Sequence, residues 1–171
     1  MKDGSEQELV GKGDLPVEIE ELSRAVIGCA IEVHRHLGPG LLERLYEEAL
    51  IYELRASGME VRSQVDIVVR YKQLELRGQR LDLLVNGTII VEIKSIATLL
   101  DVHAAVLLSY LRSLDVPVGL LINFNVIQLR QGLKRVFNGR APMVRPLPGI
   151  SAPSPSPVSS SSPSLSSPPS S

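Results

Sequence analysis

Hydrophobic residues recur along the chain at two different spacings, and each spacing predicts one kind of secondary structure. Apolar side chains repeat every three or four positions in three stretches, which we expect to form helices: residues 18–37, 42–54 and 99–114. The tripeptide Gly38-Pro39-Gly40 turns the chain after the first helix, and Gly58 ends the second. The sequence therefore predicts two helices joined by a tight turn, with a third helix much later.

Four later stretches predict strands, and the first of them alternates between apolar and polar residues, a period of two that is typical of strands. They are residues 65–71, 74–76, 81–85 and 89–93, with a turn expected near Gly78. The apolar run from Val118 to Ile122 predicts a buried strand. Residues 126–137 are ambiguous, although their apolar spacing favours a helix.

This order of elements, α-α-β-β-β-β-α-β, predicts an α/β fold with a mixed β-sheet flanked by helices. We expect one domain over residues 18–140, preceded by a flexible N-terminus over residues 1–17. Residues 141–171 contain 12 Ser and 9 Pro among 31 residues. Such a composition cannot bury enough apolar surface to offset its ordering entropy, so it predicts a disordered tail.

Composition narrows the classes of protein further. Hydrophobic residues make up 44% of the chain and aromatic residues only 4%, which predicts an aliphatic core. The lone Cys29 excludes a disulfide within the chain, and no apolar stretch is long enough for a membrane helix or a signal segment, so we expect a soluble, cytoplasmic protein. The net charge of −1 argues against a strongly basic nucleic-acid binder, although residues 21–140 hold 15 Lys/Arg against 13 Asp/Glu.

Candidate chemistry lies on the two predicted strands around Asn86-Gly87, a dipeptide that favours a hairpin. Glu92 and Lys94 share one face of their strand because side chains alternate. Asp82 lies on the neighbouring strand, and the hairpin loop decides whether it shares that face. A two-residue loop would place Asp82 and Glu92 on opposite faces, whereas a three-residue loop such as residues 85–87 places them together.

The hydrophobic pattern favours the three-residue loop, because that register gathers Leu81, Leu83, Ile89, Val91 and Ile93 on one side. If Asp82 and Glu92 converge, two carboxylates a few Å apart favour a hard cation such as Mg²⁺ between them. Such a cation would activate a water and hold a phosphate oxygen. Lys94 could then orient that water or stabilise the charge that develops on phosphate.

The spacing D-x9-E-x-K of these three residues resembles the core of the PD-(D/E)XK nuclease superfamily. A second motif, G-x-x-E-x-x-Y from Gly40 through Glu43 to Tyr46, resembles the signature of the GxxExxY protein family, a branch of that superfamily. Further stretches of the chain resemble the same family, namely Val33-His34, Leu37-Gly38-Pro39-Gly40, Gly119-Leu120-Leu121-Ile122-Asn123-Phe124 and Lys134-Arg135. The resemblance covers about residues 21–138.

The resemblance implies a restriction-endonuclease-like core and metal-dependent hydrolysis of phosphodiester bonds in DNA or RNA. It implies that Lys94, Glu92, Asp82 and Glu43 are catalytic, and that Asp82, Glu92 and Glu43 hold Mg²⁺ or Mn²⁺. His103 matches a family position on the helix after the Lys94 strand and is a candidate for lining the site, as is Tyr46. Val106 stands where the family commonly has Gln.

Other readings of these residues stay open at this stage. His103 could cap its helix, and Tyr46 could be a packing residue. Two basic clusters could contact phosphates or be ordinary solvated surface: Arg70, Lys72, Arg77 and Arg80, and Arg130, Lys134, Arg135 and Arg140. The alternatives to a nuclease are a non-catalytic nucleic-acid- or protein-binding module on the same fold, which would suit a homodimer, and a small-molecule phosphate-ester hydrolase.

Overall fold

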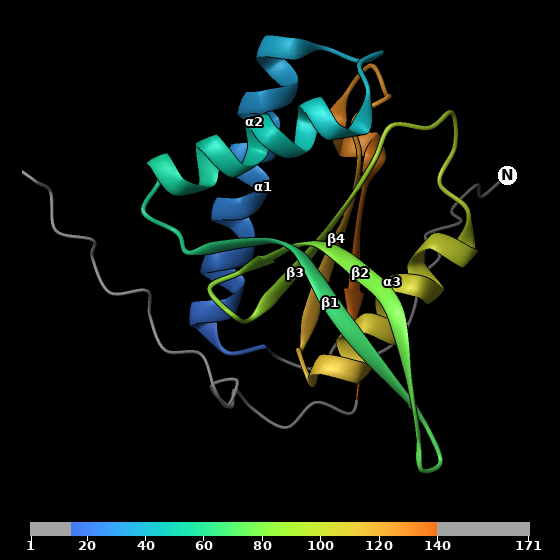
Figure 1. The fold of residues 1–171 in the computed structure, drawn as a ribbon. Helices are drawn as coiled ribbons and strands as arrows, with labels where there is room; N and C mark the ends of the chain where they lie inside the picture. The colour runs from blue at the N-terminus through green and yellow to red at the C-terminus, as the bar shows by residue number, and fades with distance from the viewer. Residues whose placement is uncertain (1–14, 140–171) are drawn as a thin grey trace, which may run out of the picture.

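The computed structural model describes residues 15–139, which form a five-stranded sheet with helices on both faces (Figure 1). The elements follow in the order α1 (Val17–Leu37), α2 (Glu43–Ala56), β1 (Val61–Tyr71), β2 (Leu74–Val85), β3 (Ile89–Lys94), α3 (Asp101–Leu114), β4 (Val118–Asn123), a 3-10 helix η1 (Leu129–Gly132) and β5 (Leu133–Phe137). The predicted α/β fold with a mixed sheet flanked by helices is therefore confirmed.

The strands lie side by side in sequence order, β1-β2-β3-β4-β5. All neighbouring pairs are antiparallel except β3 and β4, which are parallel and are joined by α3. Every residue of β4 is buried, as the apolar run in the sequence predicted. A parallel strand covered on both faces reads as a continuous apolar run, because neither of its faces meets water.

Two hydrophobic cores lie on opposite faces of the sheet. The stripe on α1 that contains Val26, Ala30 and Val33 packs with α2 against one face, where Val91 and Leu120 contribute side chains. The α3 helix covers part of the other face. The three helices predicted from the sequence are thus confirmed, since each one buries an apolar stripe.

The turn predicted near Gly78 is wrong. The chain turns at Lys72 and Gln73, and β2 then runs without a break from Leu74 to Val85. The β1–β2 register shifts between Ile67 and Val69, and Gly78 lies opposite this shift with a φ of 108°. Glycine adopts this backbone conformation readily, so it marks a bulge within a strand here rather than the end of one.

The helical preference of residues 126–137 is also wrong. Only the short η1 forms there, and β5 follows it antiparallel to β4. The apolar residues at helical spacing do not share a face: Leu129 and Leu133 pack into the α1–α2 core, whereas Val136 packs under α3. The observed order therefore has three strands before α3 and one more at the end.

The N-terminus and the Ser/Pro-rich tail predicted from the sequence fall largely on residues 1–14 and 140–171, which lie outside the described residues. Across residues 15–139, no helix combines the length and the apolar character that crossing a membrane requires. Cys29 is buried in the α1–α2 core, as expected of a small hydrophobic side chain.

Candidate active site

The hairpin between β2 and β3 brings the predicted carboxylates together. Its loop has three residues, Asn86 to Thr88, because Val85 pairs with Ile89. The loop is shifted by one residue from the predicted position, and both Asn86 and Gly87 have positive φ values of 47° and 67°. The pairing ladder ends at Leu83 and Val91, so Asp82 and Glu92 are the next residues on the two strands.

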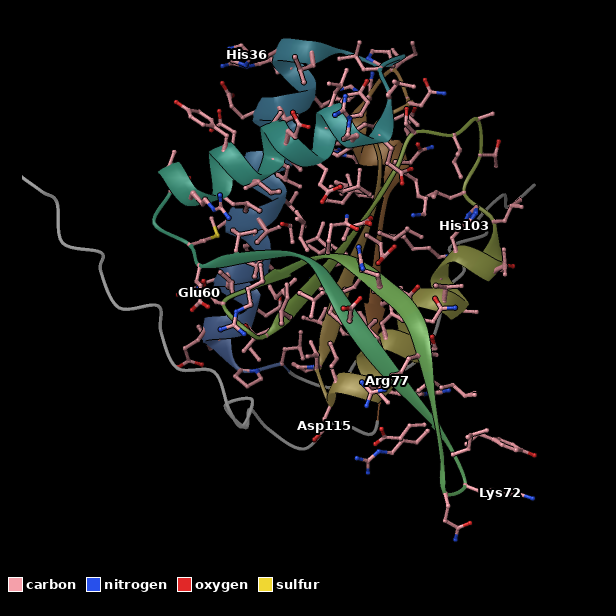
Figure 2. All side chains as sticks on the ribbon, in the orientation of Figure 1. His36, Glu60, Lys72, Arg77, His103 and Asp115 are labelled. Atoms are coloured by element: carbon pink, nitrogen blue, oxygen red, sulfur yellow. The ribbon has the colours of Figure 1, made fainter. Side chains whose placement is uncertain are left out.

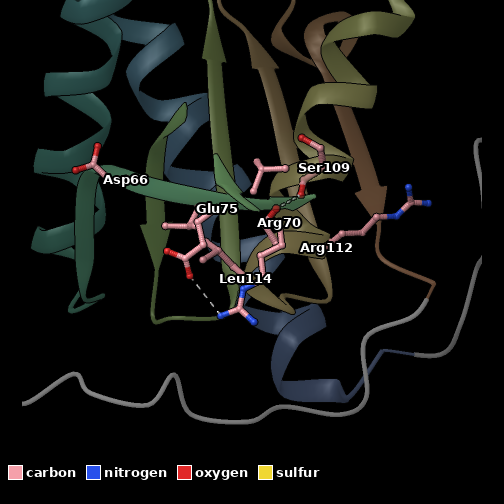
Figure 3. A pocket seen from close by; sticks show the side chains of 9 residues that line it. Asp66, Arg70, Glu75, Ser109, Arg112 and Leu114 are labelled. Carbon is pink, nitrogen blue, oxygen red and sulfur yellow. Dashed lines mark hydrogen bonds and ion pairs between the residues drawn. The ribbon is translucent and has the colours of Figure 1, made fainter. Parts of the chain in front are cut away.

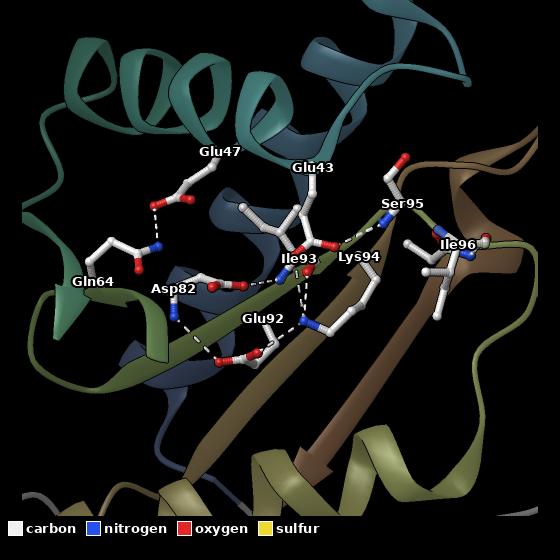
Figure 4. Close-up of polar contacts among 10 residues, drawn as sticks. Glu43, Glu47, Gln64, Asp82, Glu92, Ile93, Lys94, Ser95 and Ile96 are labelled. Atoms are coloured by element: carbon white, nitrogen blue, oxygen red, sulfur yellow. Dashed lines mark hydrogen bonds and ion pairs between the residues drawn. The ribbon is translucent and has the colours of Figure 1, made fainter. Parts of the chain in front are cut away.

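The carboxylates of Asp82 and Glu92 each accept a hydrogen bond from the backbone of the opposite strand where the ladder ends (Figure 4). The backbone N–H of Asp82 donates to Glu92 Oε1 at 3.3 Å. The N–H of Ile93 donates to Asp82 Oδ2 at 2.8 Å. Carboxylate oxygens therefore take the place of the backbone acceptors that a continued ladder would supply, and the two side chains are fixed in the gap between the strands.

Glu92 is buried, with 5% of its surface exposed. Burial raises the pKa of its carboxyl group from 4.5 to about 7, and the negative charge of Asp82 adds to the rise. The ammonium group of Lys94 opposes this effect without cancelling it. Burial and a neighbouring carboxylate both disfavour the negative charge of Glu92, and a bound cation would offset this repulsion.

Lys94 lies among the acidic groups at the end of β3. Its Nζ atom donates to the backbone oxygen of Ile93 at 2.9 Å and to Glu92 Oε2 at 3.4 Å, and it lies 3.7 Å from Glu43 Oε1. Burial alone would lower the pKa of Lys94, but the charges of Glu92, Glu43 and Asp82 outweigh it and raise that pKa. Lys94 therefore stays protonated and is held in one place by three oxygen atoms.

Glu43 reaches the same site from the other side, as the first residue of α2 (Figure 4). Its Oε2 atom accepts a hydrogen bond from the backbone N–H of Ser95 at 3.2 Å. An acidic side chain is also favoured at a helix N-terminus by the helix dipole. The structure thus brings together all four residues that the sequence singled out: Glu43, Asp82, Glu92 and Lys94.

Tyr46 lies beneath this site and does not line it. Its side chain is fully buried and its ring stacks on Phe124, with the ring centroids 4.6 Å apart. Its hydroxyl group donates to the backbone oxygen of Gly38 at 2.6 Å and accepts from the N–H of Leu41 at 3.1 Å. Tyr46 therefore fixes the turn that begins α2, and through that turn it places Glu43.

Two residues that the sequence did not assign to the site hold the end of β3. The hydroxyl of Ser95 donates to the backbone oxygen of Leu41 at 2.6 Å, which ties β3 to the turn before α2. The buried side chain of Asn123 accepts from the N–H of Ile96 at 3.1 Å and donates to its backbone oxygen at 2.8 Å. Only the pairing of β3 with β4 places Asn123 beside Lys94, so spacing in the sequence gave no signal for it.

A second pair, Gln64 and Glu47, borders the site on the side of β1 (Figure 4). Gln64 donates to Glu47 Oε1 at 2.8 Å, and Glu47 lies one turn after Glu43 on α2. Gln64 has a φ of 54°, which is rare for a residue with a side chain. Its neighbours Ser63 and Val65 pair with Leu83 and Leu81, so Gln64 lies opposite Asp82.

His103 and Tyr110 of α3 both make hydrogen bonds that hold the helix in place. His103, labelled in Figure 2, accepts a hydrogen bond on Nδ1 from the backbone N–H of Leu100 at 3.0 Å. This is a capping contact at the start of α3. Tyr110 donates to Gln79 Oε1 at 2.8 Å, and the pKa of Tyr110 is raised by burial and by the charge of Glu92.

The donor set of the site consists of carboxylate oxygens. Within residues 15–139, no group of three or more His, Cys, Asp and Glu side chains is arranged as a complete ligand cluster. Mg²⁺ is commonly bound by one or two carboxylates and keeps several waters, so the pair Asp82 and Glu92 fits this ion.

A family model described as the PD-(D/E)XK nuclease superfamily matches residues 20–136 of this chain. The match begins in α1 and ends in β5, so it covers nearly all of the described structure, including the four site residues. Nucleases of this superfamily generally use divalent metal ions. No curated protein and no solved structure matches the chain.

Proposed function

The chain belongs to the PD-(D/E)XK nuclease superfamily, and from this premise we propose that it hydrolyses phosphodiester bonds in nucleic acid with a divalent metal ion. The observation that carries the proposal is the contact between Asp82 and Glu92 at the end of the β2–β3 ladder. Ordinary solvated strand residues would point into water, whereas these two carboxylates each accept a hydrogen bond from the backbone of the opposite strand and one of them is buried.

In this proposal Asp82 and Glu92 hold Mg²⁺ or Mn²⁺, and Glu43 adds negative charge from α2 beside Lys94. When bound, such an ion lowers the pKa of a water molecule and neutralises charge on the phosphate. The N–H of Ile93 binds Oδ2 of Asp82, so this hydrogen bond does not occupy Oδ1. The hydrogen bond from Ser95 holds Glu43 in a single orientation.

Lys94 supplies positive charge at a defined point. Its Nζ atom is already fixed by the backbone oxygen of Ile93 and by Glu92, so little reorganisation is needed when a phosphate arrives. Hydrogen-bond donors that are held in place before reaction stabilise developing charge most effectively. Lys94 therefore orients the attacking water or stabilises the phosphate oxygens.

We further propose that the chain is a member of the GxxExxY branch. The structure supplies a physical reason for each fixed letter of that motif in this chain. Gly40 has a φ of 99°, Glu43 begins α2 beside Lys94, and Tyr46 binds the turn from below. The three positions together place one carboxylate over the end of β3.

The experiment that tests the proposed function is a cleavage assay with matched variants. Wild type, Glu92→Gln and Glu48→Gln are incubated with plasmid, single-stranded DNA and RNA in Mg²⁺, in Mn²⁺ and in EDTA. Glu48 is an exposed acid elsewhere on α2, so its variant controls for the loss of one charge. We expect cleavage by wild type and Glu48→Gln only with metal, and none by Glu92→Gln.

Cleavage by Glu92→Gln at the wild-type rate would contradict the proposal. Metal binding by wild type without cleavage of any of the three substrates would favour the alternative of a binding module. One observation favours this alternative: Val106 on α3 is exposed over 38% of its surface. An apolar side chain there offers no hydrogen bond to a substrate.

A further inference from the structure

The distal part of the β1–β2 hairpin projects beyond the rest of the domain (Figure 1). All eleven residues from Arg70 to Arg80 are exposed, and we call this segment the arm. The strands of the arm pair with each other up to Tyr71 and Leu74 at its tip. Tyr110 of α3 binds Gln79 at the base of the arm, but all residues of the arm stay exposed. A two-stranded hairpin gains little stability by itself, so an arm exposed along its length is suited to contact another molecule.

The arm concentrates the positive charge of the described residues. Residues 15–139 contain 14 Lys/Arg and 15 Asp/Glu, a net charge of −1. The arm contains four basic residues, Arg70, Lys72, Arg77 and Arg80, and one acidic residue, Glu75, so its charge is +3 and that of the remainder is −4. A positive arm on an otherwise acidic domain fits a polyanion.

The ion pairs within the arm leave most of this charge available. Glu75 serves both Arg77, at 2.8 Å, and Arg70, at 3.8 Å. Arg70 and Arg77 have side chains that are 80% and 73% exposed. Lys72 extends from the tip in Figure 2, where Arg77 is also labelled. Ion pairs as exposed as these are weak, so the arginines can exchange Glu75 for phosphate at little cost.

A groove beside the arm continues the same surface toward α3. Figure 3 shows Arg70 and Glu75 on one side of this groove and Ser109 and Arg112 of α3 on the other. Arg112 is exposed and adds a further cation next to the arm. The groove is also lined by Asp66, which pairs with Arg80 at 3.0 Å, so its two basic and two acidic side chains balance. The excess of positive charge therefore lies on the arm itself.

The arm and the candidate active site belong to one strand. Arg80 is two residues from Asp82 along β2, and Leu74 at the tip is eight residues away. At about 3.3 Å per residue this is roughly 26 Å of strand. Roughly the same length of duplex DNA contains about eight base pairs at 3.4 Å each.

We propose that the arm binds double-stranded DNA beside the scissile bond, with its two strands in the major groove and its basic residues on the flanking phosphates. The major groove of B-form DNA admits a two-stranded ribbon, whereas the major groove of an RNA helix is too narrow for side chains to read. Single strands are commonly bound by stacking on several aromatic residues, and the arm has only Tyr71. The inference rests on the proposed nuclease function, because it names the substrate of that site.

The test compares two double variants that each remove two positive charges. Lys72→Gln/Arg77→Gln changes the arm, and Arg24→Gln/Arg35→Gln changes exposed positions on α1. Binding of a 20-base-pair DNA duplex is measured by fluorescence anisotropy in EDTA at several salt concentrations. The same strand without its complement and an RNA duplex of equal length are measured in parallel, and thermal melting checks that both variants fold.

We expect the arm variant to bind duplex DNA about tenfold or more weakly than wild type, with a salt slope shallower by about 2 because two phosphate contacts are lost. The α1 variant should bind as wild type does. Equal effects of the two double variants, or equal binding of wild type to duplex DNA, single strand and RNA duplex, would overturn the inference. So would light scattering that shows wild type to be a dimer and the arm variant a monomer with unchanged DNA binding.

Failure of this inference is distinguishable from failure of the proposed function. The binding assay contains no metal and needs no cleavage. A protein that cleaves DNA while its arm variant binds normally contradicts the arm alone. A protein whose duplex binding depends on the arm but that never cleaves contradicts the nuclease proposal alone.

Discussion

The backbone N–H of Asp82 donates to Oε1 of Glu92 at 3.3 Å, at the point where the β2–β3 ladder ends. This contact joins the fold to the candidate chemistry. The strands part after Leu83 and Val91, and the two carboxylates replace the missing backbone acceptors. Backbone N–H groups of the hairpin therefore hold both carboxylates in position.

Replacement of Glu92 by Gln should change how stability depends on pH. The folded-state pKa of Glu92, about 7, lies above the usual 4.5, so the folded protein binds this proton more tightly than the unfolded chain does. The stability that results is fully present below pH 4.5 and is lost as pH rises through 7. Between pH 4.5 and a pH above 7, the free energy of unfolding of wild type should therefore fall by up to roughly 3 kcal/mol relative to that of Glu92→Gln.

Urea unfolding of wild type, Glu92→Gln and Glu48→Gln in EDTA at pH 5 and pH 8 measures this difference. Glu48→Gln should follow wild type, because Glu48 is an exposed residue with a side chain that is 63% accessible. Parallel pH dependence in wild type and Glu92→Gln would show that the carboxyl group of Glu92 titrates normally.

Replacement of Lys94 by Gln should separate metal binding from catalysis. Lys94 Nζ lies 3.4 Å from Glu92 Oε2, so the ammonium group competes with a metal ion for that oxygen. The variant should bind Mg²⁺ at least as tightly as wild type, while its cleavage rate falls roughly 10²- to 10³-fold, as when a fixed donor is lost. Calorimetry and a cleavage time course measure the two quantities, and a variant with wild-type cleavage would exclude the role proposed for Lys94.

Replacement of Tyr46 by Phe should weaken both the fold and the site. The variant keeps the ring that stacks on Phe124 but leaves the oxygen of Gly38 and the N–H of Leu41 without their partner. The expected loss of stability is about 1–2 kcal/mol. Cleavage should also slow, because the turn that places Glu43 loosens.

Tyr52→Phe is the matched control for this substitution. Tyr52 lies on the same helix, and 71% of its surface is exposed. Thermal melting and cleavage of the two variants are compared with wild type. Equal behaviour of Tyr46→Phe and Tyr52→Phe would show that the buried hydroxyl does not organise the turn.

Gly132 and Gly28 should respond oppositely to replacement by Ala. A Cβ atom on Gly132 would lie 2.2 Å from the backbone oxygen of Asn123, so the η1 turn or the end of β4 must move. Overpacking of this kind costs about 1–3 kcal/mol. Gly28, within α1, has no atom within 4 Å of the added Cβ, and Ala there should stabilise the helix by up to about 1 kcal/mol.

Chemical denaturation of the two glycine variants provides the comparison. A midpoint for Gly132→Ala at or above that of wild type would contradict the close approach of η1 to Asn123. Because Asn123 also holds Ile96 after Lys94, Gly132→Ala should slow cleavage as well as lower stability.

The sequence was sufficient for the parts of the site that depend on strand alternation. Glu92 and Lys94 are two residues apart, so any strand there places them on one face. The apolar pattern around Asn86-Gly87 then required a three-residue loop, and the structure has one, although it begins one residue later. The continuous apolar run of residues 118–122 likewise predicted the buried strand β4.

Other parts depend on contacts between distant segments and left no local pattern. Asn123 comes beside Lys94 only through the parallel pairing of β3 and β4, and α3 lies between them in the sequence. Gly78 predicts a turn from sequence alone because glycine suits both turns and bulges, and only pairing with β1 shows that it forms a bulge. Leu129 packs into the α1–α2 core and Val136 into the α3 core. Their helical spacing therefore did not reflect one buried helix face, and Val136 lies on strand β5.

The most direct test of the central claim is a calorimetric titration of Mg²⁺ and Mn²⁺ into wild type, Glu92→Ala, Asp82→Asn and Glu48→Gln. The account predicts that wild type and Glu48→Gln bind the ions, and that both site variants lose this binding while remaining folded. Binding that survives in Glu92→Ala and Asp82→Asn, or no binding to the wild type, would contradict a metal centre at the end of the β2–β3 ladder.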